Sequence, residues 1–360
     1  MISVLQIIDT LEIGGAERLA VNYANELSQK GIKSHLCTTR AEGLLKNSIE
    51  KDVGYFFLKR KSTLDIKAVL RLRSYISKNN IDILHAHASS FFIASLVKLS
   101  FPKLKLIWHD HYGNSEFLNK RNTKVLRVCS LLFTQIFSVN QILEFWAKNK
   151  LWCKRVRYIS NFPILKETHL NQTILKGENE KRIICLANLR AQKNHIRLLE
   201  AFKKVNETYP DWTLHCIGKD FEDSYSSLFF SKIEELKLNN HAFFYNSKSD
   251  VLNILQQSTI GVLVSKSEGL PLALLEYGIA NLPVICTDVG DCGKLISDES
   301  YGILLENDKE SEIANAIVNF IENKKYREAS SKKYHNKIID TYSSEVVINE
   351  VVTVYNTILN

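Results

Sequence analysis

The sequence lacks any apolar run long enough to cross a membrane as a helix. None of its 360 residues belongs to a run of the roughly 18 consecutive apolar residues that a crossing needs. The nearest candidate, 125–139, is interrupted by Arg127 and four other polar residues. The opening MISVLQIIDT also lacks the basic segment and cleavage site of a leader peptide. These absences predict a cytoplasmic chain without a membrane-spanning segment.

A disulfide or zinc framework is missing as well. The seven cysteines are odd in number and scattered along the chain, without the close pairs that bind zinc. Several of them, such as Cys185, Cys216 and Cys286, lie in apolar strand-like runs. We expect reduced thiols in the core, which fits the cytosol.

Acidic residues are scarce in the first half of the chain. Residues 1–170 hold 26 Lys and Arg against 13 Asp and Glu, whereas the remaining residues hold 21 against 26. The interleaved aromatics and helix-turn-helix pattern of a nucleic-acid-binding protein are absent. The basic half therefore predicts contact with an anionic membrane surface or a phosphorylated acceptor, and no nucleic acid. Solubility alone is the competing explanation.

What is present is an alternation of short apolar runs with longer amphipathic ones, the pattern of parallel sheets with crossover helices. The expected strands are 3–8, 33–38, 55–58, 81–85, 105–109, 135–139, 156–159, 182–187, 213–218, 242–245, 260–264 and 283–286. The expected helices are 16–30, 66–78, 89–100, 123–132, 196–209, 226–236, 251–256, 272–280, 313–323 and 343–359. Residues 166–181 are polar and aperiodic, which predicts a linker between two doubly wound α/β domains. Ligands are then expected in a cleft, at the carboxyl ends of the strands.

A pair of glycines follows the first strand. Gly14 and Gly15, in DTLEIGGAER, open a helix and can form a tight loop whose N–H groups face a ligand. The third glycine of a dinucleotide-binding fingerprint is missing, because Leu19 occupies its place, and no acidic residue ends the next strand. A nicotinamide cofactor is therefore not expected.

Four histidines stand at the ends of two neighbouring strands. His85 and His87 lie in ILHAHASS, and His109 and His111 lie in IWHDHYGNS. A single histidine is more often structural, but four at adjacent strand ends favour ligand binding. Alternate residues at a strand end need not converge on a metal. We therefore expect hydrogen bonds from them to hydroxyl or phosphate groups, and no metal.

The most informative stretch is SKSEGLPLALLEYG, 265–278, which follows an apolar strand-like run. Pro271 suits the first turn of a helix, and Gly269 lets the backbone approach a ligand closely. A helix N-terminus at a strand end is a natural diphosphate site, and Glu268 and Glu276 flank it. Taken alone, the stretch also fits an ordinary strand–turn–helix with solvated acids. Its candidate ligand-binding residues are Ser267, Glu268, Gly269, Leu270, Pro271 and Glu276.

Two cations follow an earlier strand of the same half. Arg190 and Lys193, in LANLRAQKNH, stand in a strand-to-helix loop, where they can neutralise charge that develops on a leaving diphosphate. Exposed Arg and Lys are common in loops, so this indication depends on its combination with Glu268 and Glu276.

In combination, these motifs resemble those of the family 4 retaining glycosyltransferases. The resemblance covers nearly the whole chain, from GGAERLA through IWHDHYGNS, ISNFP and LANLRAQKNH to SEGLPLALLEYGIANLPVICTDVGD. It implies a GT-B fold, in which two Rossmann-like doubly wound domains face each other across a cleft. The N-terminal domain, 1–165, would bind the acceptor, and the C-terminal domain, 166–340, would bind a nucleotide sugar. A C-terminal helix, 341–360, would cross back to the first domain.

For the C-terminal domain, the resemblance implies that Glu276 bonds the ribose hydroxyls of the donor and that Glu268 contacts the sugar. The backbone N–H groups of Gly269 and Leu270 add to this side of the site. Lys193 is implied to neutralise the diphosphate.

For the N-terminal domain, the resemblance implies that Gly15 approaches the diphosphate and that His109 or His111 meets the sugar near the reacting carbon. The sequence does not decide between the two histidines. One position departs from the family pattern: the arginine expected five residues before the lysine is Asn188 here. Arg190 is the candidate that replaces its charge.

The implied reaction moves a hexosyl group, with retained anomeric configuration, from a nucleotide diphosphate sugar, expected to be a UDP-sugar. The acceptor would be a glycan or a lipid-linked glycan in bacterial surface polysaccharide synthesis, at the inner face of the membrane. No cofactor or metal is expected, in keeping with the absence of an Asp-x-Asp motif. No covalent nucleophile is assigned, although Glu268 is a candidate.

Two alternatives stay open. A nucleotide-sugar epimerase shares the architecture, but the spacing of Glu268 and Glu276 disfavours it. A non-catalytic partner subunit is disfavoured because both glutamates, Lys193 and the histidines are all present.

Overall fold

The computed structural model describes residues 1–113, 118–119, 121–165 and 173–360, which form two compact α/β units. Unit 1 comprises Met1–Phe162 and Ser344–Asn360, and unit 2 comprises Pro163–Ser343. The first part of the predicted linker, 166–172, lies outside the described residues.

Unit 1 contains a parallel sheet of seven strands in the order β3-β2-β1-β4-β5-β6-β7. The strands are β1 (Ser3–Thr10), β2 (Lys33–Ala41), β3 (Gly54–Phe57), β4 (Ile83–His87), β5 (Lys105–Asp110), β6 (Gln135–Ser138) and β7 (Val156–Tyr158). The central strands β1, β4 and β5 are buried along nearly their whole length, as expected for a sheet covered on both faces. The strand order reverses between β1 and β4, and ligands bind at such reversals in open α/β sheets.

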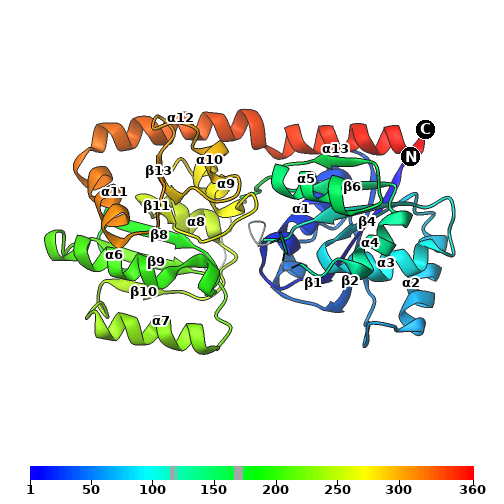
Figure 1. Ribbon diagram of the computed structural model, residues 1–360, viewed down its shortest axis with the longest axis horizontal. Coiled ribbons are helices and arrows are strands. Elements are labelled where there is room, and N and C mark those ends of the chain that lie inside the picture. Colours follow the sequence, from blue (N-terminus) through cyan, green and yellow to red (C-terminus); the bar gives the residue numbers. More distant parts are fainter. Residues whose placement is uncertain (114–117, 120, 166–172) are drawn as a thin grey trace. The chain divides into compact units, whose positions relative to one another are not determined.

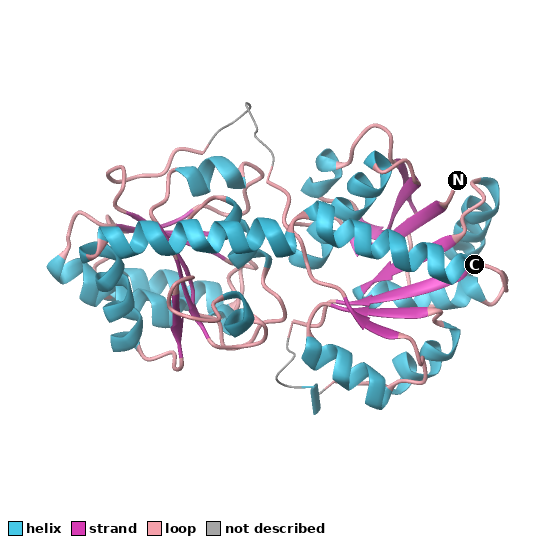
Figure 2. Ribbon diagram, turned by 90° about the horizontal axis from the view of Figure 1, so that it is seen from above, coloured by secondary structure: helices cyan, strands magenta, loops and turns pink. Residues whose placement is uncertain are grey.

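Helices cover both faces of this sheet (Figures 1 and 2). They are α1 (Gly15–Gln29), α2 (Ile66–Lys78), α3 (Phe91–Lys98), α4 (Lys124–Cys129), α5 (Gln141–Lys150) and α13 (Ser344–Leu359). α1 packs against α13, whereas α2 to α5 share one core with Leu84, Trp108 and Ile136 of the sheet. Asp65 and Asn140 cap α2 and α5 by accepting hydrogen bonds from backbone N–H groups.

Unit 2 contains a parallel sheet of six strands in the order β10-β9-β8-β11-β12-β13. The strands are β8 (Arg182–Leu186), β9 (Thr213–Ile217), β10 (Ala242–Phe244), β11 (Ile260–Leu263), β12 (Val284–Thr287) and β13 (Ile303–Leu305). Here the strand order reverses between β8 and β11. The loops that follow these two strands are therefore the expected position of a ligand site.

The helices of unit 2 also form two layers. They are α6 (His195–Thr208), α7 (Ser224–Glu235), α8 (Val251–Gln256), α9 (Leu272–Ile279), α10 (Cys292–Leu295), α11 (Glu310–Glu322) and α12 (Lys324–Tyr342). α6 packs against α7 and α11, and α9 packs against α12. Among the described residues, none of the helices combines the length and the apolar character that a bilayer crossing needs. All seven cysteines are buried and unpaired, as predicted.

The predicted alternation is confirmed, since every predicted strand overlaps an observed one. β13, α5, α10 and α12 are absent from the prediction. β13 is three residues long, but so are β7 and β10, which were predicted, so its length alone does not explain its absence. α12 is mostly polar, and its buried Tyr334, Ile338 and Tyr342 recur at intervals of four among polar residues. So narrow an apolar stripe gives little helical signal.

Candidate functional site

The candidate donor site lies at the carboxyl edge of the sheet of unit 2. β8 and β11 are adjacent in that sheet, so the loops that follow them, 187–194 and 264–271, lie side by side. The backbone N–H of Lys266 donates to the carbonyl of Gln192 at 2.8 Å. The side-chain amide of Gln192 donates to the carbonyl of Ser267 at 2.7 Å. Strand pairing thus joins the two motifs that sequence analysis had singled out separately.

Glu268 and Lys193 form an ion pair at this edge. Nζ of Lys193 lies 2.5 Å from Oε1 of Glu268, and the same oxygen accepts a hydrogen bond from Oγ of Ser265 at 2.6 Å. The side chain of Glu268 is 6% exposed and that of Lys193 is 22% exposed. Loss of one partner would leave an uncompensated charge that is largely removed from water. The pair is therefore a built feature of the site and not a surface contact.

The turn after β12 supports the Glu268 loop. The backbone N–H of Asp291 donates to the carbonyl of Gly269 at 2.9 Å. Gly290 has a φ of +59°, and a Cβ on it would lie 2.3 Å from the carbonyl oxygen of Glu268. Only glycine combines the left-handed backbone with so close an approach.

We expect Gly290→Ala to destabilise unit 2 by about 3 kcal/mol, from about 1–2 kcal/mol of left-handed strain and displacement of the Glu268 loop. Gly31→Ala is the matched control, because Gly31 has a φ of +75° but a Cβ there would meet nothing within 4 Å. Chemical denaturation of the control should show a loss of only about 1 kcal/mol. Equal losses of stability in the two variants would show that the close approach of Gly290 to Glu268 does not contribute to the stability.

Glu276 lies in the second turn of α9 and is 2% exposed. The predicted place of Pro271 in the first turn of this helix is wrong by one position. Pro271 has an extended ψ of 121° and precedes the helix as its N-cap, so that helical geometry starts at Leu272. Ser267 and Leu270 are buried in the loop before it.

Arg190 and Asn188 both contact the segment that follows β9. The guanidinium carbon of Arg190 lies 4.5 Å from the centre of the Phe221 ring. The side-chain oxygen of Asn188 accepts a hydrogen bond from the backbone N–H of Lys219 at 2.8 Å. That Arg190 supplies the positive charge of the arginine expected at position 188 stays a prediction.

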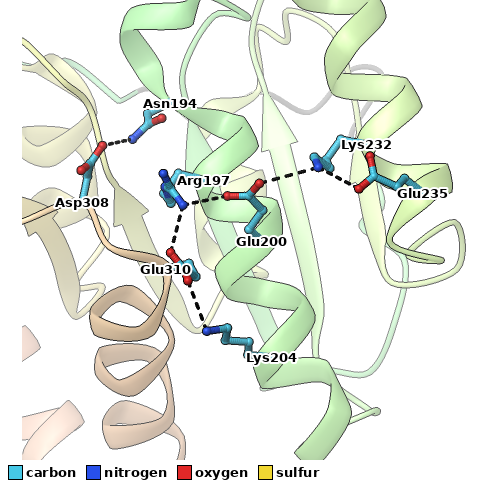
Figure 3. A network of polar contacts seen from close by, with 8 residues as sticks. All are labelled: Asn194, Arg197, Glu200, Lys204, Lys232, Glu235, Asp308 and Glu310. Carbon is cyan, nitrogen blue, oxygen red and sulfur yellow. Dashed lines mark hydrogen bonds and ion pairs between the residues drawn. The ribbon is translucent and has the colours of Figure 1, made fainter.

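Asn194 forms the turn between Lys193 and α6. It has left-handed dihedrals, φ 59° and ψ 34°, which asparagine tolerates better than most residues. Its side-chain amide donates to Asp308 at 2.9 Å. Figure 3 shows the polar contacts around this turn, which involve Asn194, Arg197, Glu200, Lys204, Lys232, Glu235, Asp308 and Glu310. Each exposed ion pair contributes little stability, but together they join α6 to α7 and α11 beside Lys193.

In unit 1, the two glycines stand where the strand order reverses. Gly14 precedes α1 with an extended backbone, and Gly15 is the first helical residue, so the pair forms a strand-to-helix turn. Asp9, which sequence analysis did not single out, ends the same strand and accepts hydrogen bonds from Thr39 and from Ser89. These bonds connect the ends of β1, β2 and β4. A carboxylate directly at the end of the first strand was the available signal.

The four histidines form one stack of rings in unit 1. Their stacked pairs have centroids 4.2 to 5.4 Å apart and interplanar angles of 7 to 28°. Nδ1 of His85 lies 2.6 Å from the hydroxyl of Tyr355, and Nε2 of His87 lies 2.8 Å from the side-chain oxygen of Gln6. Neither ring nitrogen of His109 has a hydrogen-bond partner in the part of the chain that is described. His85 and His87, two of the predicted ligand donors, are thus hydrogen-bonded within the protein.

Burial distinguishes the two histidines between which the sequence did not decide. His109 is fully buried, with no exposed surface. His111 lies just beyond β5 and keeps some exposed surface, and its Nε2 lies 3.0 Å from Nδ1 of His87. Of the pair, His111 is the one that a ligand can reach in this conformation.

Burial also keeps the stack uncharged. It lowers the pKa of His85, His87 and His109 well below the ordinary range of an imidazole, and it lowers the pKa of His111 to about 3. The ring nitrogens of His85, His87 and His109 lie within 4.8 Å of one another, which is a candidate metal site by distance. However, the planes of His85 and His109 are only 7° apart, so their lone pairs run side by side. Tetrahedral ligands converge instead, and we interpret the stack as packed neutral rings.

Two further members of this cluster have no recognisable sequence signal. Tyr355 lies on α13, 270 residues after His85. Tyr23, on α1, packs edge-on against His85 and His109 with ring centroids 5.4 and 5.6 Å away. Both tyrosines stand on apolar helix faces, where an aromatic residue is an ordinary core residue.

Two family models match the chain in sequence order. Residues 13–162 match the model described as Glycosyltransferase Family 4, and residues 167–337 match the model described as Glycosyl transferases group 1. Gly14, His109, Lys193, Glu268 and Glu276 all fall within the matched residues.

Known bacterial proteins are similar over nearly the whole chain. UDP-Gal:alpha-D-GlcNAc-diphosphoundecaprenol alpha-1,3-galactosyltransferase from Escherichia coli is 23% identical, over 95% of this chain and 94% of its own length. The O-antigen biosynthesis glycosyltransferase WbnH from Escherichia coli is 27% identical, over 94% and 96%. Among solved structures, Anabaena HepE in complex with UDP-glucose is similar with a TM-score of 0.82 at 15% identity, covering 99% of this chain and 100% of that one. At that identity, the structural likeness concerns the fold.

Proposed function

Because this chain belongs to the family 4 glycosyltransferases and has the GT-B fold, we propose that it is a retaining hexosyltransferase with a UDP-sugar as donor. The proposed acceptor is a glycan, free or lipid-linked, in the synthesis of a bacterial surface polysaccharide. The relatives support this choice: one is named for a UDP-galactose donor and a diphosphoundecaprenol-linked acceptor, and another for O-antigen biosynthesis.

The observation that carries the proposal is the buried Glu268–Lys193 pair at the carboxyl edge of β8 and β11. Lys193 can neutralise a diphosphate there, and the carboxylate of Glu268 can accept hydrogen bonds from sugar hydroxyls. We assign Glu276 to the ribose hydroxyls, and the backbone N–H groups of Gly269 and Leu270 to the sugar.

We assign acceptor binding to unit 1. Gly14 and Gly15 offer backbone N–H groups at the reversal of strand order. His111, which keeps exposed surface, is the histidine that we propose to bond a ligand hydroxyl. The enzyme would work in the cytoplasm at the inner face of the membrane, where a lipid-linked acceptor is presented.

In the proposed reaction, the bond between the anomeric carbon and the diphosphate oxygen breaks. The acceptor oxygen bonds to the same carbon from the same face, and its proton passes to the departing diphosphate. Lys193 and the N-terminus of α9 stabilise the charge on the leaving group.

Since no metal has a part in this scheme, the addition of EDTA is expected to leave the rate unchanged.

The test is incubation of the full chain with a series of nucleotide sugars and a diphosphoundecaprenol-linked sugar, followed by NMR of the product. Transfer from a UDP-sugar with an unchanged anomeric configuration would support the proposal. An inverted linkage would contradict the retaining mechanism. Transfer from a donor with another base would contradict the choice of UDP.

Incubation with the donor alone distinguishes the epimerase. A glycosyltransferase leaves the sugar of the intact donor unchanged, whereas an epimerase returns a nucleotide sugar of altered configuration without any acceptor. Turnover by neither route, with any donor of the series, would favour the non-catalytic subunit.

A further inference from the structure

Unit 1 exposes apolar side chains on two neighbouring helical segments outside the candidate site. One segment is α4 with the 3-10 turn Ser130–Leu132 that follows it, and the other is α5 with the residues just after it. The exposed apolar residues are Val125, Val128, Leu131, Ile142, Phe145 and Trp152, and together they are called the α4–α5 apolar face. Phe145 is 72% exposed. Side chains of this size in water mark an interaction surface when they gather in one place.

These side chains lie on one side of the sheet. α4 connects β5 to β6, and α5 connects β6 to β7, so right-handed crossovers place both helices on the same face. Both helices bury their inner sides in one core, through Leu126 and Trp146. Trp152 joins the two segments, because its backbone N–H donates to Oγ of Ser130 at 2.9 Å and its ring lies 4.9 Å from the guanidinium of Arg127.

The same segments are strongly basic. Their exposed cations are Lys124, Arg127, Lys148, Lys150, Lys154 and Arg155. Between residues 121 and 157 the sequence holds one acidic residue, Glu144, and it is paired with Lys148 at 2.7 Å. Protein–protein interfaces are depleted in lysine. Trp, Phe and Leu side chains beside Lys and Arg are typical of surfaces that lie in the interface of an anionic bilayer.

We propose that the α4–α5 apolar face binds an anionic lipid bilayer, with its apolar side chains among the headgroups and its cations on the lipid phosphates. The benefit of this contact rests on the proposed function, since a lipid-linked acceptor is presented at such a surface. The binding itself needs neither donor nor turnover. It can therefore be measured apart from the reaction.

The test is flotation of the full chain with vesicles of phosphatidylcholine alone or with about one third phosphatidylglycerol. We expect binding to the anionic vesicles only, and weaker binding at high salt. Val128→Asp, Leu131→Asp and Phe145→Asp, combined in one variant, should weaken it at least tenfold. Glutamine in place of Lys124 or Lys150 should weaken it by about fivefold per cation.

Leu228→Asp is the matched control, because Leu228 lies on α7 of unit 2 and is 50% exposed, against 65% for Leu131. It should bind vesicles as the wild type does, and thermal melting checks that every variant is folded. The triple variant should still transfer sugar to a water-soluble acceptor. Failure of transfer by every variant and the wild type would contradict the proposed function and leave the vesicle result intact.

Three results would overturn the membrane proposal. The first is a wild type that does not float with anionic vesicles. The second is a triple variant that floats as well as the wild type. The third is a wild type that dimerises through this face in sedimentation experiments without binding vesicles, which would make the face a protein interface.

Discussion

Lowering the pH from about 7.5 to about 5.5 is expected to destabilise unit 1 by about 5 kcal/mol, because the histidine stack cannot take up protons while it stays folded. A loss of this size is comparable with the whole stability of many domains, about 5–15 kcal/mol. The side chains packed against the stack include Tyr23, Tyr355, Phe137 and Gln6. These groups are aromatic or uncharged, so they do not favour an imidazolium.

The sign follows from the pKa shifts. In the folded chain the pKa of His85, His87 and His109 lies well below the ordinary value of 6.5, and that of His111 is about 3. Below pH 6.5 the unfolded chain binds a proton at each imidazole, whereas the folded chain does not. The free energy of unfolding therefore decreases as the pH is lowered, by about 1.4 kcal/mol per pH unit for each histidine. The loss begins near pH 6.5 and continues down to the folded-state pKa values.

Tryptophan fluorescence during urea unfolding can follow this loss, because Trp108, Trp146 and Trp152 belong to unit 1, against Trp212 alone in unit 2. His109→Phe removes one titrating ring without breaking a hydrogen bond, since neither nitrogen of His109 has a partner among the described residues. It should reduce the pH slope by about a quarter and raise the stability near neutral pH by about 1–3 kcal/mol.

His241→Gln is the control, because His241 directly precedes β10 in unit 2. This variant should leave the pH dependence of the stability of unit 1 unchanged. If the stability of unit 1 stayed level over the whole pH range, the rings would have to be charged or hydrated in the folded chain. That result would reopen the stack as a ligand or metal site.

Local signals were enough to predict most of the fold. The strands are short apolar runs bounded by polar loops, and α2 and α8 begin and end where their sequence periodicity predicts. α12 escaped prediction because its buried face is one narrow stripe on a charged helix. Its helical state depends on packing against α9, which is not a local property of the sequence.

The candidate site was predictable to the level of loops and no further. The importance of Glu268 and Lys193 could be inferred from their motifs, but their ion pair depends on the adjacency of β8 and β11. Strand order is a long-range property that neither motif encodes. The burial of His109 likewise depends on Tyr23 and Phe137, which lie on other elements of unit 1.

Lys193→Met is expected to lower kcat/KM for the proposed donor by about 10²–10³ and to weaken the binding of free UDP at least tenfold. The reason is that the proposed contact of Lys193 is with the diphosphate, which UDP retains. Glu268→Gln should lower transfer by a similar factor but leave UDP affinity close to that of the wild type, because UDP lacks the hexosyl group that Glu268 is proposed to contact. Calorimetric titration with UDP, beside the transfer assay, measures both effects.

Glu276→Gln should give a third pattern. Its proposed contact is with the ribose hydroxyls, so the variant should lose affinity for UDP and for the UDP-sugar alike. Glu234→Gln, on the exposed side of α7, is the matched control and should change neither measurement. A Glu276→Gln enzyme with undiminished affinity for UDP would contradict the assignment of this residue to the donor.

The observed ion pair suggests a competing explanation, in which Lys193 acts only by holding Glu268 in place. In that case Lys193→Met and Glu268→Gln would lose equal activity, the double variant would lose no more than either, and all three would bind UDP normally. Direct contact with the diphosphate predicts instead that UDP affinity falls in Lys193→Met and in the double variant alone. Ser265→Ala separates positioning from charge, because Ser265 donates to the same oxygen of Glu268 and carries no charge of its own. If Glu268 has to be held in position, Ser265→Ala should reduce transfer at constant UDP affinity. The UDP affinity of Lys193→Met then decides whether Lys193 acts by holding the carboxylate of Glu268 or by contacting the diphosphate.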